Sequence, residues 1–169
     1  MSRRHRSILV SGLASVALGA SGCLYGFTGG GLPGHVKTVA VRPFENLTPV
    51  AELQRELSDA LRSELHGRLG VRDAPESRAN AIVRGTIQRY EADIPVSYDA
   101  ANRATTTARR LLQIVIDIEV LDQVTGKTLW QRKGLTGDGQ YEEGGEAAGR
   151  RNAINRIVNT VVEGAQSQW

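Results

Sequence analysis

Hydrophobic and polar residues alternate with a period of two in several stretches of this 169-residue chain. The clearest stretch runs from Leu112 to Val120, where apolar residues at the even positions alternate with residues that include Gln113, Asp117 and Glu119. Because successive side chains of a strand point to opposite sides of a sheet, this pattern predicts a strand with one buried and one polar face. Shorter alternating stretches predict further strands at residues 36–42, 81–91 and 128–133.

Two other stretches repeat apolar residues at helical spacing. In the first, a leucine recurs every four residues: Leu53, Leu57, Leu61, Leu65 and Leu69. This predicts an amphipathic helix with Thr48 as its N-cap, Pro49 at its first position and Gly70 at its end. In the second, the apolar stripe comprises Ile154, Ile157, Val158, Val161, Val162 and Ala165, which predicts a C-terminal helix ending near Trp169.

The predicted elements follow the order β-α-β-β-β-α. The turn residues Asp122 to Gly126 separate the third and fourth strands, so these two strands should form a hairpin. Residues 92–109 should form a connection or a hairpin tip. We therefore expect an α+β two-layer sandwich, with a four-stranded mixed sheet covered by two helices on one face. The other face of the sheet is polar enough to meet water or a wet partner surface.

The N-terminus has the order of a secretory signal, with a basic start, a short apolar run at residues 7–20 and small residues before Cys23. The apolar run is too short to cross a bilayer, which takes about 20 residues. The pattern resembles the lipobox of bacterial lipoproteins, which implies a signal peptide at residues 1–22 and lipid attached to Cys23. The alternative is a buried structural cysteine. Residues 23–34 would be the lipidated cysteine and a Gly-rich tether, and residues 35–169 one domain.

Cleavage of the signal peptide would change the charge of the chain. The whole sequence has 21 basic and 18 acidic residues, but Arg3, Arg4 and Arg6 belong to the predicted signal. The mature chain would therefore carry 21 − 3 = 18 basic residues against 18 acidic ones. This balance gives no reason to expect a nucleic acid as partner.

Eight parts of the sequence together resemble the LPS-assembly lipoprotein LptE family. They are residues 25–29, 32–33, 36–46, 95–99, 122–130 and 139–141, the long isoleucine-rich strand at residues 112–120, and the C-terminal helix up to Trp169. The resemblance implies a two-layer α+β protein anchored in the outer membrane through Cys23. It also implies that the protein sits inside an LptD-type β-barrel, assists the assembly of that barrel and helps lipopolysaccharide reach the outer leaflet. Leu24, where many inner-membrane lipoproteins have aspartate, agrees with the outer membrane as destination.

Five basic residues are candidates for contact with lipopolysaccharide, because arginine recognises phosphates and carboxylates in a bidentate manner. They are Arg103, Arg109, Arg110, Arg132 and Lys133. Two interpretations stay open for them, namely one basic patch for lipid A or core sugars, or an ordinary solvated charged face.

No arrangement of residues indicates catalysis, a metal or a cofactor. His35 and His66 have no serine or cysteine beside them in a nucleophile motif, and residues 29–31 precede a strand rather than opening a helix as a phosphate loop does. We expect that the protein is not an enzyme. The Pro-Phe-x-Asn sequence after the first strand also resembles TolB-like and CsgG-like envelope proteins, so a secretion or scaffold component is the alternative function. A periplasmic hydrolase is a third.

Overall fold

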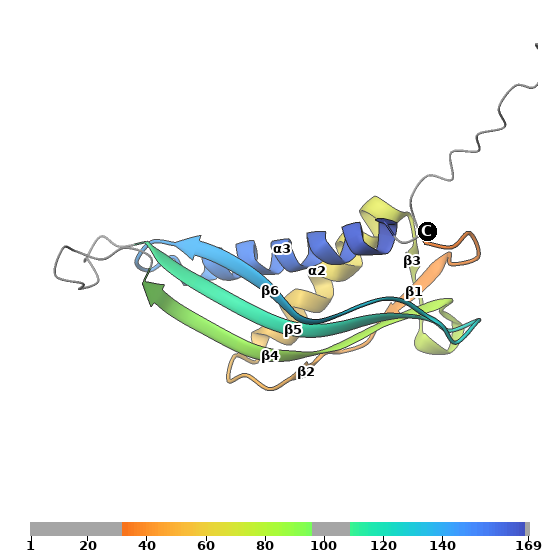
Figure 1. Ribbon diagram of the computed structural model, residues 1–169, viewed down its shortest axis with the longest axis horizontal. Coiled ribbons are helices and arrows are strands. Elements are labelled where there is room, and N and C mark those ends of the chain that lie inside the picture. The colour runs from red at the N-terminus through yellow and green to blue at the C-terminus, as the bar shows by residue number, and fades with distance from the viewer. Residues whose placement is uncertain (1–31, 96–108, 168–169) are drawn as a thin grey trace, which may run out of the picture.

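The computed structural model describes residues 32–95 and 109–167. Its elements are β1 (Thr38–Val41), β2 (Glu45–Asn46), α2 (Glu52–Leu69), β3 (Arg72–Asp73), the 3-10 helix η2 (Glu76–Arg78), β4 (Ala81–Pro95), β5 (Arg110–Asp122), β6 (Thr128–Tyr141) and α3 (Glu146–Ser167). Figure 1 shows one long, curved sheet with both helices on the same face. The predicted α+β two-layer architecture is therefore confirmed.

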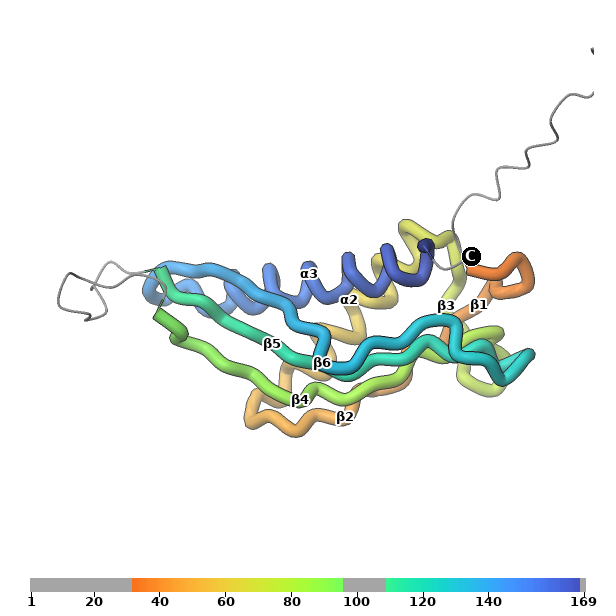
Figure 2. Tube along the Cα trace, viewed as in Figure 1, coloured from red at the N-terminus to blue at the C-terminus, as the bar shows by residue number. Residues whose placement is uncertain are grey.

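The sheet is mixed, as predicted, with the strand order β3-β1-β4-β5-β6 and with β2 also paired to β4. The short strands run parallel to their neighbours, whereas β4, β5 and β6 are antiparallel and lie side by side along most of the molecule (Figure 2). The four predicted strands correspond to β1, β4, β5 and β6. The sheet has six strands because β2 and β3 add to it. Each of these is two residues long, too short to show an alternating pattern.

The core lies between the sheet and the two helices. Along β5 the predicted alternation is observed, with Ile114 and Ile116 at most 1% exposed and the intervening residues partly exposed. On α2 the leucine stripe faces the same core, since Leu57 and Leu61 are also at most 1% exposed. Gly70 ends this helix in the left-handed conformation, with φ of 65°, as the sequence predicts.

Helix α3 lies directly on the edge strand β6, and glycines make this close approach possible. A Cβ on Gly139 would lie 1.8 Å from the carbonyl oxygen of Gly149 in α3, and one on Gly137 would lie 2.3 Å from the carbonyl oxygen of Ala153. Near the end of α3, a Cβ on Gly164 would meet the indole of Trp130 at 2.3 Å. Backbone therefore contacts backbone, or an aromatic ring, where side chains normally separate a helix from a sheet.

Three predicted boundaries are wrong. Helix α2 begins at Glu52, and its N-cap is Ala51 without a side-chain capping bond. Thr48 instead belongs to a turn, in which the Asn46 side-chain oxygen accepts hydrogen bonds from the Thr48 amide at 3.0 Å and hydroxyl at 2.8 Å. This local bond competes with the helical conformation, as short polar side chains often do.

The other two wrong boundaries are strand ends, first that of the last strand. β6 continues eight residues beyond Lys133 to Tyr141, whereas the sequence predicts an end at residue 133. The glycines at 134, 137 and 139 hide this continuation, because a glycine has no side chain to mark the buried or the exposed face. β4 likewise extends to Pro95, beyond the predicted end at residue 91.

Candidate functional site: the polar face of the sheet

The sheet face that the helices leave uncovered carries hydrogen-bonded rungs of polar side chains between β4, β5 and β6. In the first rung, Arg84 on β4 donates two hydrogen bonds to one carboxylate oxygen of Glu119 on β5, at 2.9 and 2.8 Å. The hydroxyl of Thr128 on β6 donates to the other oxygen at 2.7 Å. These two partners, Thr128 first, lower the pKa of Glu119, so the carboxylate stays ionised.

Two further rungs continue along the same face. Asp117 on β5 accepts a hydrogen bond from the Gln88 side chain at 3.0 Å and another from the backbone amide of Gly134 at 2.8 Å. Farther from the β5–β6 turn, Gln113 donates to Asp138 at 3.0 Å. The alternation of β5 explains the placement, because every second residue must point away from the helices.

A shallow depression of about 400 Å³ lies on this polar face, between the rungs and the start of β2. Basic and acidic groups both line it, among them Arg42, Arg84, Lys133, Glu45 and Asp117. Because basic and acidic groups are both present, the depression is better suited to bind a hydrated, polar surface of a partner than a strongly charged small ligand.

The five residues predicted to contact lipopolysaccharide do not form one patch among the described residues. Arg103 lies outside them. In the register of β5 and β6, Arg110 is opposite Tyr141 and Arg132 is opposite Ile118. These positions are eight residues apart along β5, which corresponds to roughly 26 Å. Antiparallel pairing causes this separation, since the residues nearest the β5–β6 turn on β6 face the end of β5 rather than its start. Contact with lipopolysaccharide stays a prediction for each of the two places.

At the start of β5, Arg110 joins a junction that the sequence did not reveal. Arg110 pairs with Asp93 at 2.9 Å, and Asp93 has a positive φ of 65°, which is uncommon for a residue other than glycine. The hydroxyl of Tyr141 on β6 donates to the Asp93 carboxylate at 2.7 Å and accepts from the Asp93 amide at 3.0 Å. The hydrogen bond from Tyr141 is the main cause that lowers the pKa of Asp93. The junction therefore holds together the ends of three strands.

A second, partly buried network links the helices to each other and to β4. Arg150 of α3 donates to both carboxylate oxygens of Glu56 of α2, at 2.9 and 3.2 Å. Glu146 lies 3.8 Å from Arg150 and also accepts a hydrogen bond from the Tyr90 hydroxyl. Burial is the main cause that raises the pKa of Tyr90 to about 12, followed by its bond to Glu146. Each of these groups has a hydrogen-bond or ion-pair partner within the network, so we interpret the network as one that stabilises the fold.

The two histidines that the structure describes each lie within hydrogen-bonding distance of one other group. His66 is exposed, as predicted, and one ring nitrogen lies 3.1 Å from the carbonyl oxygen of Val71. His35 lies 2.7 Å from the carboxylate of Asp122, whose side chain is only 2% exposed. Asp122 also accepts hydrogen bonds from the Thr125 hydroxyl at 2.7 Å and the Val124 amide at 2.9 Å, and thereby shapes the β5–β6 turn.

Over the described ranges 32–95 and 109–167, no three His, Cys, Asp or Glu residues are grouped so that they could hold a metal ion. None of the helices in these ranges is long and apolar enough to cross a membrane. Cys23 lies outside the described residues, so its attachment to lipid stays a prediction.

The comparisons with known proteins give a family and a fold. The family model LptE, described as lipopolysaccharide-assembly, matches residues 36–163. Among solved structures, the PelC dodecamer from Paraburkholderia phytofirmans is similar with a TM-score of 0.53 and 14% identity, over 83% of this chain and 96% of that chain. The hypothetical protein CT253 from Chlamydia trachomatis has a TM-score of 0.52 and 12% identity, over 78% and 96% of the two chains. No curated protein matches the sequence. At these identities the structural likeness concerns the fold.

Proposed function

The chain belongs to the LptE family of lipopolysaccharide-assembly proteins, and from this premise we propose that it is a lipid-anchored outer-membrane protein. In this proposal it occupies an LptD-type β-barrel from the periplasmic side, helps that barrel to assemble and assists the insertion of lipopolysaccharide into the outer leaflet. The observation that carries the proposal is the family match over residues 36–163, which spans both helices and all six strands up to Glu163.

The polar face of the sheet supports a place inside a wide barrel. The lumen of such a barrel is polar, so an occupant needs a surface that exchanges water for hydrogen bonds without large apolar patches. The rungs around Asp117 and Glu119 have this character, because each charged group there is already paired and exposes polar atoms. Broad complementarity of this kind needs no reactive side chain, and a non-catalytic role is consistent with the family.

Depletion of the protein in the native cell tests this function. We expect less folded barrel, measured by its heat-modifiable mobility in gels, and less lipopolysaccharide at the cell surface. A copy carrying Ile116→Ala should rescue poorly, because this core substitution destabilises the domain. A copy carrying Glu52→Gln should rescue well, because it alters one exposed group in the first turn of α2, away from the polar face. Normal barrel and normal surface lipopolysaccharide after depletion would contradict the proposal.

A scaffold that assembles with copies of itself is the second candidate function. It is favoured by the fold likeness to a subunit of the PelC dodecamer and by β6, which forms an edge of the sheet. An exposed edge strand can pair with another chain through main-chain hydrogen bonds. Affinity purification from detergent-solubilised membranes separates the two candidates. A large outer-membrane barrel as the main partner supports the first, and a homogeneous ring of this chain supports the second.

A further inference from the structure

Four basic residues gather at one end of the domain, the end where the described chain begins. They are Lys37, Arg72, Arg78 and Lys127, which we call the basic pole, and all four are exposed. Main-chain hydrogen bonds connect this end of the sheet from edge to edge. The Arg72 amide donates to the Lys37 carbonyl at 3.0 Å, and the Asp122 amide donates to the Lys127 carbonyl at 2.8 Å. Between these two points, Asn80 accepts from Gln123 at 2.8 Å and donates to Thr38 at 3.1 Å.

The nearby acidic groups do not neutralise the basic pole. Asp73 lies 3.8 Å from Arg62, and Glu76 accepts a hydrogen bond from Arg42 at 2.8 Å, so both acids are engaged by other arginines. Asp122 is buried and bound to His35 and to the turn amides. Between described residues, none of the four basic side chains of the pole takes part in an ion pair. The pole therefore presents net positive charge, although the mature chain as a whole would be neutral.

The opposite end of the sheet carries charges of both signs. Glu142 and Glu143 are exposed there, Glu91 lies 3.5 Å from Arg89, and Arg110 pairs with Asp93 at the start of β5. The two ends are separated by the length of β5, which at 13 residues is roughly 40 Å. Along its long axis the domain thus has the basic pole at one end and mixed charges at the other.

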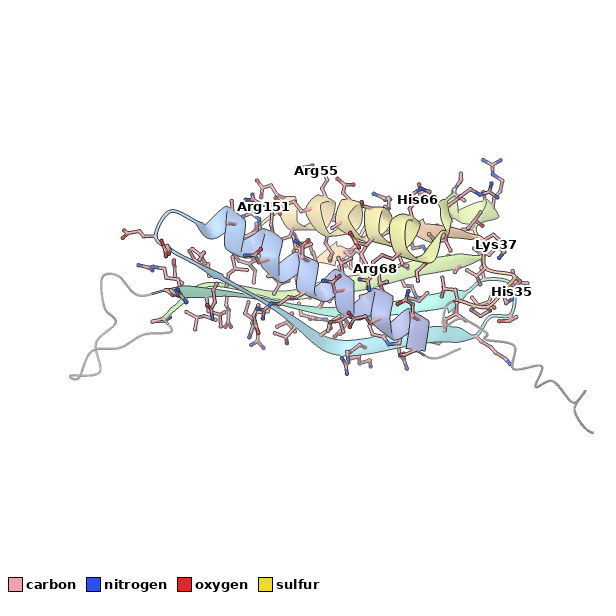
Figure 3. All side chains as sticks on the ribbon, turned by 90° about the horizontal axis from the view of Figure 1, so that it is seen from above. His35, Lys37, Arg55, His66, Arg68 and Arg151 are labelled. Carbon is pink, nitrogen blue, oxygen red and sulfur yellow. The ribbon has the colours of Figure 1, made fainter. Side chains whose placement is uncertain are left out.

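An exposed apolar residue lies within the basic pole. Val124 is 66% exposed in the β5–β6 turn, and the Asp122 carboxylate holds its amide in place at 2.9 Å. Figure 3 shows Lys37 and His35 at this end of the molecule, well apart from Arg55 and Arg151 on the helices. A protruding apolar side chain among basic residues is a combination that suits the interface of an anionic bilayer.

The predicted tether brings this end toward the membrane. Leu32 packs against the core and His35 is held by Asp122, so the folded domain begins at the basic pole. Eight residues lie between Cys23 and Leu32, and the Gly-rich tether that the sequence predicts would span roughly 16 Å on average over that length. The opposite end of the sheet, roughly 40 Å farther along β5, would then point away from the lipid.

We propose that the basic pole is a membrane-docking surface, on which Lys37, Arg72, Arg78 and Lys127 contact the phosphate headgroups of an anionic bilayer and Val124 enters the interface. This inference rests on the lipid anchor of the proposed function, but it does not depend on the barrel. Docking sets the orientation of the domain while it is outside the barrel, with the basic pole on the bilayer surface and the opposite end of the sheet away from it.

A single introduced thiol tests the docking. With Cys23 acylated, a Ser77→Cys variant carries one free thiol next to Arg78, and a Glu143→Cys variant carries one at the opposite end of the sheet. The lipidated full chain, labelled there with a fluorophore, is reconstituted into phosphatidylcholine vesicles with or without phosphatidylglycerol, which also contain lipids with a quenching headgroup. We expect strong quenching of the label at residue 77 in the anionic vesicles, weak quenching in the neutral ones or at high salt, and little quenching at residue 143.

Charge reversal identifies the responsible residues. One basic residue near an anionic surface contributes a factor of about five in surface affinity, so changing all four to glutamate should leave few molecules docked. The matched control reverses Arg55, Arg89, Arg151 and Arg156, which are exposed elsewhere on the domain, and should keep the quenching. Circular dichroism must show that both variants fold. If the fourfold variant does not fold, single Lys37→Gln and Lys127→Gln variants replace it, and each is expected to reduce quenching in part.

The outcomes of this experiment show whether the docking proposal is wrong, independently of whether the proposed function is wrong. Equal quenching in neutral and anionic vesicles, or quenching that survives reversal of the pole, would overturn docking. A label at residue 77 that responds only when an outer-membrane barrel is added would assign the pole to a protein partner and overturn it too. The mass of the mature protein reports the anchor on its own, and the depletion experiment reports the barrel.

Discussion

Replacing Gly139 by alanine tests how closely α3 lies on β6. The added Cβ would lie 1.8 Å from the carbonyl oxygen and 2.6 Å from the carbonyl carbon of Gly149. Both atoms belong to the backbone of α3, so no side chain can turn aside to relieve the contact. Because nonbonded heavy atoms prefer separations of about 3.5 Å, the helix must retreat by roughly 1.5 Å at this point.

This displacement would loosen the packing of α3 against β6. The loss in free energy of unfolding can be taken from other proteins in which a core was overpacked. Overpacking typically costs about 1–3 kcal/mol, which for a domain of this size lowers the melting temperature by roughly 2–10 °C. Strand propensity by itself predicts the opposite sign, because glycine weakens the interior of a strand. The sign of the change in the free energy of unfolding therefore shows whether tertiary packing or local strand propensity dominates at position 139.

Gly67→Ala provides the matched control. Gly67 lies inside α2, and a Cβ there would meet nothing within 4 Å. The substitution should stabilise the protein by about 0.5–1 kcal/mol through the higher helix propensity of alanine. Urea unfolding followed by circular dichroism measures both variants against wild type. A Gly139→Ala protein as stable as wild type, or more stable, would refute the close contact between α3 and β6 described above.

Three other predictions concern the anchor, the core and acid stability. Cys23→Ser should leave an unprocessed or soluble periplasmic protein in cell fractionation, whereas an unmodified Cys23 in membrane-bound mature protein, seen by mass spectrometry, would refute lipidation. Leu61→Ala and Ile116→Ala should each cost about 2–5 kcal/mol in denaturant unfolding, because both side chains are 0% exposed, and wild-type stability would contradict their place in the core. Burial opposes ionisation of Asp122, but hydrogen bonds led by that from Thr125 outweigh it and lower its pKa to about 2. A depressed folded-state pKa gives stability that is present above the unfolded value near 4 and is lost as the pH falls through about 2. Asp122→Asn should therefore flatten the acid unfolding curve in this window, and an unchanged curve would rule out the contribution of Asp122.

Local sequence patterns were sufficient for most of the fold. The alternation of β5 and the leucine stripe of α2 depend on side-chain periods of two and of nearly four residues, and these periods can be recognised in the sequence alone. For this reason the buried face of Ile114 and Ile116, the face of Leu57 and Leu61, and the order of the long elements followed from the sequence. The polar face of the sheet followed as well, because Asp117 and Glu119 must lie opposite the buried side of the same strand.

Contacts between distant parts of the chain could not be obtained in this way. The register of β5 against β6 separates Arg110 from Arg132, and it depends on all the pairs along both strands rather than on either residue. Glycines conceal both the last part of β6 and its contact with α3. Position 139 needs a glycine because a Cβ there would meet the backbone of Gly149, ten residues later.

The pairing of His35 with Asp122 and the gathering of the basic pole have the same origin. Lys37, Arg72, Arg78 and Lys127 are spread over 91 positions of the sequence, and no local pattern connects them. They come together because parallel pairing places the starts of β1, β3 and β4 at one end of the sheet, where the β5–β6 turn also lies. Side-chain periodicity is a local property that a sequence displays directly, whereas the meeting of strand ends depends on long-range pairing that exists only in the folded chain.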